Sequence, residues 1–239
     1  MKLYVIGNGF DLHHGIRSSF GDFARYAQRE HRDVADAVER YLPAAGADWW
    51  NLEAALAELD YEGVVDDCGI FVPSYAADDF KPGDFEVEVG RVADALSTGP
   101  RRAFSAWIHT VEIPDQSKRI ALDPRSLFLS FNYTDTLSRL YSIPATQVWH
   151  VHGKVPCRPT EIVLGHAWKA ADRRPTNPST DSEDYDFWVD LGYRHLDEYF
   201  ENTFKASERV IRDNAHRFAQ LHSLSEVIVL GHSLAEVDY

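Results

Sequence analysis

The segment Lys2-Leu-Tyr-Val-Ile6, followed at once by Gly7-Asn8-Gly9-Phe10-Asp11, decides the fold of this 239-residue chain. Its mainly apolar run predicts a β-strand, and Gly-x-Gly after such a strand is typical of the turn into a helix of an α/β sheet. Glycines at this turn let a ligand approach the backbone, whose N–H groups can bind a phosphate. A nucleotide is therefore our first hypothesis, with the N–H groups of residues 7–10 as the expected diphosphate contacts.

The glycine spacing departs from the usual dinucleotide fingerprint. In that fingerprint the third glycine follows the second by three residues. Here it is Gly15, six residues after Gly9. Since Gly-x-Gly after a strand also forms tight turns without a ligand, the hypothesis depends on the rest of the chain.

Composition excludes several classes of protein. The chain is 44% hydrophobic and 26% charged, as in globular domains, and its net charge of −14 argues against binding nucleic acid through phosphates. It has no apolar run of the roughly 20 residues that a membrane span needs and no recognisable signal peptide. Its two cysteines, Cys68 and Cys157, are too few for a four-cysteine zinc site and fit a reducing compartment. We therefore expect a cytoplasmic protein that does not enter the membrane.

Helical periodicity dominates the region after the first turn, where no segment predicts a strand. We therefore expect a helical insertion or cap over about residues 26–119. Gly99-Pro100 is expected to separate two helices there. The helices are expected over residues 18–41, 49–61, 84–95 and 101–111, with a long loop over 62–84.

Apolar runs that predict strands return in the second half of the chain. They cover residues 126–131, 147–151, 161–164 and 225–231. Helices are expected over 134–141 and 187–221, with a polar loop over 172–184. Continuous apolar strands separated by helices indicate a parallel sheet covered on both faces. We predict a single Rossmann-like α/β domain with its core in residues 1–25 and 120–239, and further sequence after Tyr239 in the intact protein.

Four of these strands end in polar clusters. In a parallel sheet the carboxyl ends of the strands converge on one crevice, where ligands bind. We therefore expect the clusters to line one pocket. The clusters are Gly7-Asn8-Gly9-Phe10-Asp11, Asn132-Tyr133-Thr134-Asp135, His152-Gly153 and Gly231-His232-Ser233-Leu234.

These clusters resemble the AbiH family of phage abortive-infection proteins over essentially the whole chain. The resemblance rests on Gly-Asn-Gly-Phe-Asp at residue 7, Ser-Phe-Asn-Tyr-Thr at 130, His-Val-His-Gly at 150 and Gly-His-Ser at 231. Trp49-Trp50-Asn51-Leu52-Glu53 is similar to the Trp-x-x-x-Glu helix of that family. The resemblance implies a role in antiphage defence, as a homo-oligomer or with a partner of the defence system.

The order of the motifs also resembles the more distant Sir2-like fold, whose members consume NAD. Gly7-x-Gly9 with Gly15-Ile16 matches the sirtuin glycine loop, and His152-Gly153 matches the catalytic His-Gly. Residues 130–134 stand where sirtuins have Thr-Gln-Asn-Ile-Asp, and residues 231–234 resemble Gly-Thr-Ser-Leu. The zinc-ribbon cysteines are absent, and residues 17–20 depart from Pro-Asp-Phe-Arg. The resemblance therefore implies NAD hydrolysis, as in Sir2-like defence proteins, rather than protein deacetylation.

The chemistry of NAD cleavage assigns roles to these residues. Breaking the nicotinamide–ribose bond builds positive charge on the ribose. Asn132 is expected to orient the attacking water or to bind the ribose, and His152 to act as general base. Asp11 is a second candidate for a ribose contact. The remaining contacts to the nucleotide are expected from Gly7, Asn8, Gly9, Phe10, Gly231, His232 and Ser233.

Other interpretations stay open at this point. Asn132 and Asp11 are also typical helix-capping residues, and His152 can be a structural turn residue. A second hypothesis is a metal-dependent hydrolase or nuclease that uses four histidines. A third is a sensor that binds the nucleotide without cleaving it. The four histidines are His150, His152, His166 and His232.

Overall fold

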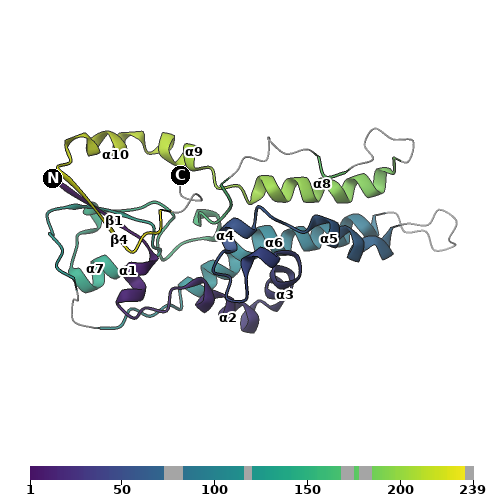
Figure 1. The fold of residues 1–239 in the computed structure, drawn as a ribbon, viewed down its shortest axis with the longest axis horizontal. Coiled ribbons are helices and arrows are strands. Elements are labelled where there is room, and N and C mark those ends of the chain that lie inside the picture. Colours follow the sequence, from purple (N-terminus) through teal and green to yellow (C-terminus); the bar gives the residue numbers. More distant parts are fainter. Residues whose placement is uncertain (73–82, 116–119, 168–174, 178–184, 235–239) are drawn as a thin grey trace.

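A four-stranded, fully parallel sheet forms one end of this computed structural model, and helices form the other (Figure 1). The strand order is β3-β2-β1-β4, which matches the first four strands of the Rossmann order 3-2-1-4-5-6 and confirms the predicted α/β class. The strands are β1 (Lys2–Ile6), β2 (Leu127–Ser130), β3 (Val148–His150) and β4 (Glu226–Leu230). The structure describes residues 1–72, 83–115, 120–167, 175–177 and 185–234.

Alternation along the strands gives the sheet two faces. Tyr4 pairs with Phe128 in the register of β1 and β2, and their rings stack 5.1 Å apart on one face. Helices α1 (Asn8–His13) and α7 (Thr136–Tyr141) contribute Phe10 and Leu137 to the buried cluster on that face. On the other face Phe218 of α10 (Ala215–Ala219) lies edge-on to Trp149 of β3. Helices therefore cover both faces of the sheet, as predicted.

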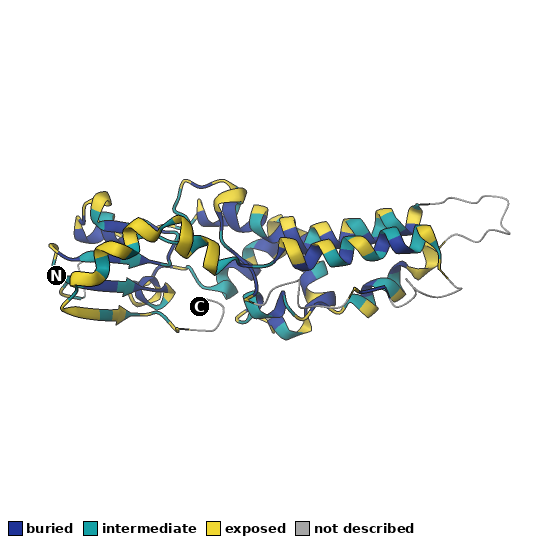
Figure 2. Cartoon of the chain, turned by 90° about the horizontal axis from the view of Figure 1, so that it is seen from above, coloured by how far each residue is buried: buried dark blue, intermediate teal, exposed yellow. Residues whose placement is uncertain are grey.

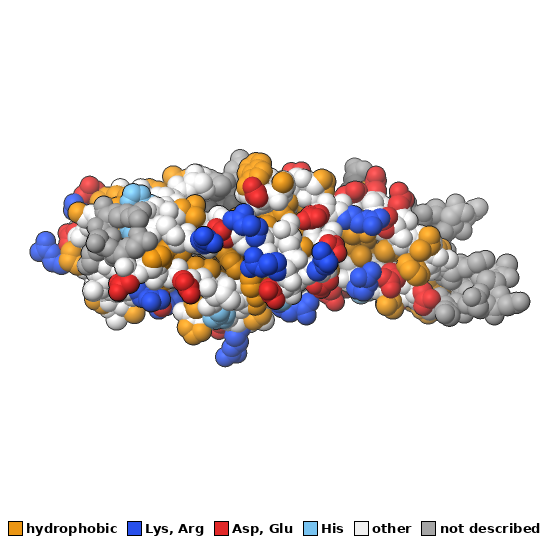
Figure 3. All heavy atoms as spheres, turned by 90° about the horizontal axis from the view of Figure 1, so that it is seen from below, with side chains coloured by type: hydrophobic (Ala, Val, Ile, Leu, Met, Phe, Trp, Pro, Cys, Tyr) orange, Lys and Arg blue, Asp and Glu red, His pale blue; other side chains and the backbone are white. Residues whose placement is uncertain are grey.

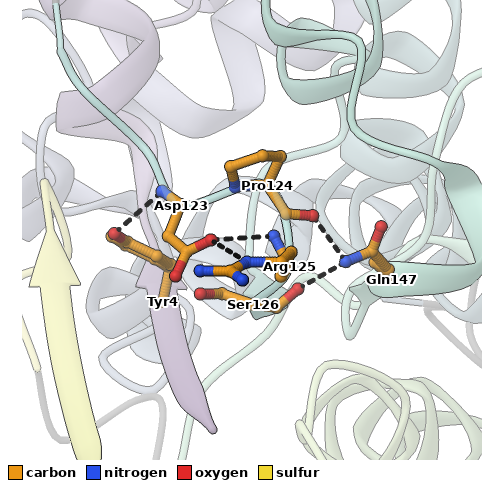
Figure 4. A network of polar contacts seen from close by, with 6 residues as sticks. All are labelled: Tyr4, Asp123, Pro124, Arg125, Ser126 and Gln147. Atoms are coloured by element: carbon orange, nitrogen blue, oxygen red, sulfur yellow. Dashed lines mark hydrogen bonds and ion pairs between the residues drawn. The ribbon is translucent and has the colours of Figure 1, made fainter.

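Polar contacts tie three strands together at the amino end of the sheet (Figure 4). The backbone N–H of Asp123 donates to the Tyr4 hydroxyl at 3.2 Å, and that of Arg125 donates to the Asp123 carboxylate at 3.0 Å. The Gln147 amide donates to the carbonyls of Pro124 and Ser126 at 2.7 and 2.9 Å. These bonds anchor the segment before β2 between β1 and β3.

The helical end has a buried cluster of its own, which runs along its long helices (Figure 2). Helices α6 and α8 pack lengthwise, and Tyr199 of α8 donates to the carbonyl of Leu56. The helices are α2 (Phe20–Glu30), α3 (Arg32–Tyr41), α4 (Leu52–Ala55), α5 (Tyr61–Cys68), α6 (Asp84–Ile108) and α8 (Phe187–Asn202). Short 3-10 turns span Pro43–Ala45, Gly69–Phe71, Ala145–Gln147, Pro159–Glu161 and Gln220–Ser223.

Several expected helix boundaries were wrong. The helix expected over residues 18–41 is broken at His31, whose φ of −139° is not helical. Residues 84–108 form one helix, although Pro100 lies inside it. A Cβ at Gly99 would lie 2.9 Å from a methyl of Val34 in α3, so this glycine permits close helix packing rather than a break. Packing along α6 has thus outweighed the local signal of Gly99-Pro100.

Two further expectations for the helical end need correction. Residues 61–68, placed largely in the expected loop, form α5, whereas the helix expected over 49–61 shortens to Leu52–Ala55. Trp49 is buried, whereas Trp50 is 74% exposed and its ring lies over Gly46. Residues 73–82 of the expected loop over 62–84, and residues 172–174 and 178–184 of the polar loop, lie outside the described residues.

In the second half of the chain the structure differs from the predicted strands and from the predicted division between sheet and helices. Residues 161–164 form no strand, because Ile162 and Leu164 are buried against the helical cluster instead. β4 is an edge strand of the described sheet, and its Val227 and Val229 are 55% and 42% exposed, so this strand is less covered than the predicted sheet, which was expected to be covered on both faces. Helix α8 packs into the helical cluster, although the sequence placed residues 120–239 with the sheet.

Candidate functional site

The polar clusters meet in a cavity of about 320 Å³ at the carboxyl ends of the strands. The cavity lies where the chain crosses from one side of β1 to the other, the usual ligand position in open α/β sheets. The structure thus brings together nine of the ten residues predicted for the site. They are Gly7, Asn8, Gly9, Asp11, Asn132, His152, Gly231, His232 and Ser233.

The tenth residue, Phe10, and the glycine-loop N–H groups differ from expectation. The ring of Phe10 is buried in the sheet core. The N–H of Gly7 donates to the carbonyl of Leu230 at 3.0 Å, and that of Gly9 donates to the carbonyl of Gly231 at 2.8 Å. The N–H of Phe10 donates to the carbonyl of Gly7 at 2.9 Å. The expectation that these three groups face a diphosphate is therefore corrected.

The glycines of the loop are required by close packing of backbone on backbone. A Cβ on Gly7 would lie 2.4 Å from the Cα of His232, and one on Gly9 would lie 2.8 Å from the Cα of Gly231. Gly231 itself has a φ of +66°, and a Cβ there would lie 2.1 Å from the N atom of Phe10. The turns after β1 and β4 therefore press against each other, which brings their side chains to one cavity wall.

Asp11 is a buried carboxylate that lines the cavity. Thr134 donates a short hydrogen bond to its Oδ2, whereas its Oδ1 is buried without a hydrogen-bond partner in the described structure. Burial raises the pKa of Asp11 above its usual value, against the hydrogen bond from Thr134, which lowers it. Asp11 is therefore an acceptor that a ligand donor could satisfy.

Asn132 is fixed by three contacts. Its side-chain amide donates to the carbonyl of Gly7 at 3.0 Å, and its backbone N–H donates to the Ser130 hydroxyl at 3.2 Å. His150 donates from Nδ1 to the Asn132 carbonyl at 2.8 Å, and burial lowers the pKa of this histidine, which favours its neutral form. His150 thus holds Asn132 in place from the neighbouring strand.

The rings of His152 and His232 both contact the ring of Phe131. Phe131 is 5.0 Å from the ring of His152, at right angles to it, and 4.1 Å from the ring of His232. His152 is 8% exposed, and its ring also lies 6.2 Å from Tyr133. Nδ1 of His232 accepts the N–H of Leu234 at 2.9 Å, which closes the turn after β4. These rings form the apolar wall of the cavity.

Sequence reasoning missed much of the wall of the cavity. Thr134 and Tyr133 stood in a quoted cluster but received no role. Phe104 and Ile108 belong to no sequence motif, because they reach the cavity only through the packing of α6. The lining residues without an assigned role are Leu12, Ser18, Phe20, Phe104, Ile108, Phe131, Tyr133, Thr134 and Leu164.

Glu53 brings the helical end into the site. It lines the cavity from α4 and forms an ion pair with Lys205, whose Nζ lies 3.5 Å from Oε1. The side chain of Lys205 is 2% exposed. Backbone bonds between His166 and both Thr203 and Lys205 hold the lysine in position. The Trp-x-x-x-Glu pattern had already singled out Glu53, and its place in the cavity is consistent with that pattern.

The four histidines of the metal hypothesis do not form one cluster, although His152 and His232 both line the cavity. His166 is buried with Nε2 against the carbonyl of Phe200, and Nδ1 of His150 is bonded to Asn132. Among the residues that the structure describes, no three His, Cys, Asp or Glu side chains are grouped so that they could hold a metal ion. This arrangement gives the second hypothesis no support.

The charge of the molecule is mixed on the surface that Figure 3 shows, where Lys and Arg side chains alternate with Asp and Glu. The cavity differs, because its described lining includes Asp11 and Glu53 but neither Lys nor Arg. Within the described part of the chain no helix is long and apolar enough to span a membrane.

Comparison with known protein families gave one match. The model of the family described as Bacteriophage abortive infection AbiH matches residues 3–239. The chain belongs to the AbiH family. Neither the search of curated proteins nor that of solved structures gave a match, so the likeness to Sir2-like domains stays a prediction. Membership of AbiH associates the chain with abortive infection by bacteriophage and names no ligand or reaction.

Proposed function

We propose that this AbiH protein binds NAD in the cavity at the strand ends and hydrolyses its nicotinamide–ribose bond during antiphage defence. The observation that carries the proposal is the buried Oδ1 of Asp11, which has no hydrogen-bond partner among the described residues and lines the same cavity as Asn132 and His152. A ribose diol supplies the donors that such a carboxylate lacks, and burial in a low-dielectric cavity makes that contact strong.

The proposed reaction uses Asp11, Asn132 and His152, which line the same cavity. The oxygen of a water molecule bonds to the anomeric carbon, the carbon–nitrogen bond breaks, and nicotinamide leaves neutral with the bonding electron pair. His152 takes the water proton, since a histidine titrates near neutral pH. Asn132, held by Gly7 and His150, orients the water or the ribose. The charge of Asp11 stabilises the positive ribose in the transition state.

The corrected glycine loop limits what this cavity supplies. The N–H groups of Gly7, Gly9 and Phe10 are bonded to backbone carbonyls, and the described lining carries negative charge. The cavity therefore suits the ribose and the scissile bond better than the diphosphate. The sensor hypothesis keeps the same pocket without turnover, and the experiment below separates the two.

The test is to incubate the purified protein with NAD and measure free nicotinamide. Changing Asn132→Ala or His152→Ala is expected to lower the rate about 10²- to 10⁴-fold, the range for general acid–base groups. Asn202→Ala and His222→Ala are matched controls, because both side chains are exposed outside the cavity. Binding of NAD without turnover would establish the sensor instead, and absence of binding would refute both hypotheses.

A further inference from the structure

A second cavity, of about 170 Å³, adjoins the first across Phe131 and His152, which line both. Its walls are mostly apolar and come from β2, from the segments after β3, and from α9 (Ser207–Asp213) and α10. Its polar lining in the described residues is Lys205, Ser207 and His152. The proposed function leaves this second cavity unused.

Lys205 gives the second cavity a buried positive charge. Its side chain is 2% exposed, and the Glu53 carboxylate at 3.5 Å belongs to the wall of the first cavity. That separation is longer than the 2.7–2.9 Å typical of a charge-assisted hydrogen bond. An ammonium has three N–H donors, so a lysine can contact a carboxylate and a ligand oxygen at once. Apolar walls strengthen such a contact by excluding water.

We propose that Lys205 binds a phosphate group of the nucleotide in this second cavity, with the ribose in the first cavity and His152 between them. This inference rests on the proposed function and deepens it. It follows from two observations: the glycine-loop N–H groups are already bonded, and the first cavity has no described Lys or Arg in its lining. Lys205 supplies the positive charge that the first cavity lacks.

The first experiment needs no nucleotide. Inorganic pyrophosphate is expected to raise the thermal unfolding midpoint of the wild type and of Lys205→Arg, which keeps the charge, but not that of Lys205→Met. The matched control is Lys2→Met, which removes a lysine–glutamate pair at the opposite end of the sheet. Glu53→Gln removes the competing carboxylate and is expected to strengthen the response. If Lys205 only serves a structural pair with Glu53, none of these proteins will respond to pyrophosphate.

The second experiment compares NAD with nicotinamide riboside, which lacks the phosphates. The wild type is expected to have a KM for NAD about 10- to 100-fold below that for the riboside, the value of one charge-assisted contact. In Lys205→Met the KM for NAD should rise toward that for the riboside, so that this preference is lost. Equal KM values for NAD in the wild type and Lys205→Met would overturn the inference and leave the proposed function standing. A Lys205-dependent response to pyrophosphate without any cleavage of NAD would support the phosphate site and overturn the proposed hydrolysis.

Discussion

Each end of the sheet holds an aspartate, and the pKa values of the two are shifted in opposite directions. At the amino end the backbone N–H of Arg125 donates to Asp123 and lowers its pKa. At the carboxyl end burial raises the pKa of Asp11, whose Oδ1 has no hydrogen-bond partner among the described residues. The amino end uses its polar groups to hold strands together. The carboxyl end keeps a costly carboxylate beside a cavity, as is typical of a functional site.

The largest effect is expected where the carboxyl end packs most tightly. Gly231→Ala places a Cβ 2.1 Å from the Phe10 N atom at a φ of +66°. We expect a loss of about 3–5 kcal/mol in the free energy of unfolding, measured with urea, because neither backbone segment can move aside cheaply. Gly69→Ala is the control, since nothing lies within 4 Å of its Cβ position and its φ of −57° is ordinary. A stable Gly231→Ala protein would contradict the tight packing of the two turns.

A smaller change of opposite sign is expected for Asp11→Asn. Removing the buried charge should raise the free energy of unfolding by about 1–3 kcal/mol at neutral pH, the usual cost of an unsatisfied buried group. It should also abolish NAD binding, measured by calorimetry. Asp123→Asn, at the other end of the sheet, should lower stability slightly and leave binding intact. If Asp11→Asn destabilises the protein, Asp11 is a structural residue like Asp123.

The pH dependence of stability should differ between wild type and Asp11→Asn. Because the folded state raises the pKa of Asp11 above the unfolded value of 3.8, the folded protein binds the proton more tightly. This contribution is greatest below pH 3.8 and is lost as pH rises to the folded pKa, by up to about 1.4 kcal/mol per pH unit. Denaturation of both proteins at several pH values gives the difference. A difference independent of pH would show that burial leaves the pKa of Asp11 unchanged.

The smallest effect is expected at the amino end. Gln147→Ala removes the donor that serves the carbonyls of Pro124 and Ser126. We expect a loss of about 0.5–1.5 kcal/mol in stability. NAD binding and nicotinamide release should not change, because the amino end lies away from the cavity. Loss of activity in a stable Gln147→Ala protein would show that the two ends are coupled.

Sequence reasoning reached the sheet and most of the site because both follow from local patterns. An apolar run before Gly7 or Asn132 marks where a parallel strand ends, and the topology then collects those ends. In contrast, the N–H of Gly9 is hydrogen-bonded to the carbonyl of Gly231, which lies 222 residues later in the sequence. No local pattern shows such a contact.

The helical end was predicted less well because packing there overrides local signals. Pro100 remains inside a helix that packs against α8, and Trp50 lies exposed beside the buried Trp49. The roles of Phe104 and Ile108 in the cavity wall depend on where α6 passes the sheet. Lys205, outside every quoted motif, acquires its place through the backbone bonds to His166.

The position of Glu53 has a consequence for mechanics. The cavity wall combines residues that follow the strands of the sheet with residues of the helical cluster, such as Phe104 and Ile108. A ligand that contacts both parts of the wall links the sheet to the helical end. Binding in the cavity is therefore expected to limit movement of the helical end relative to the sheet.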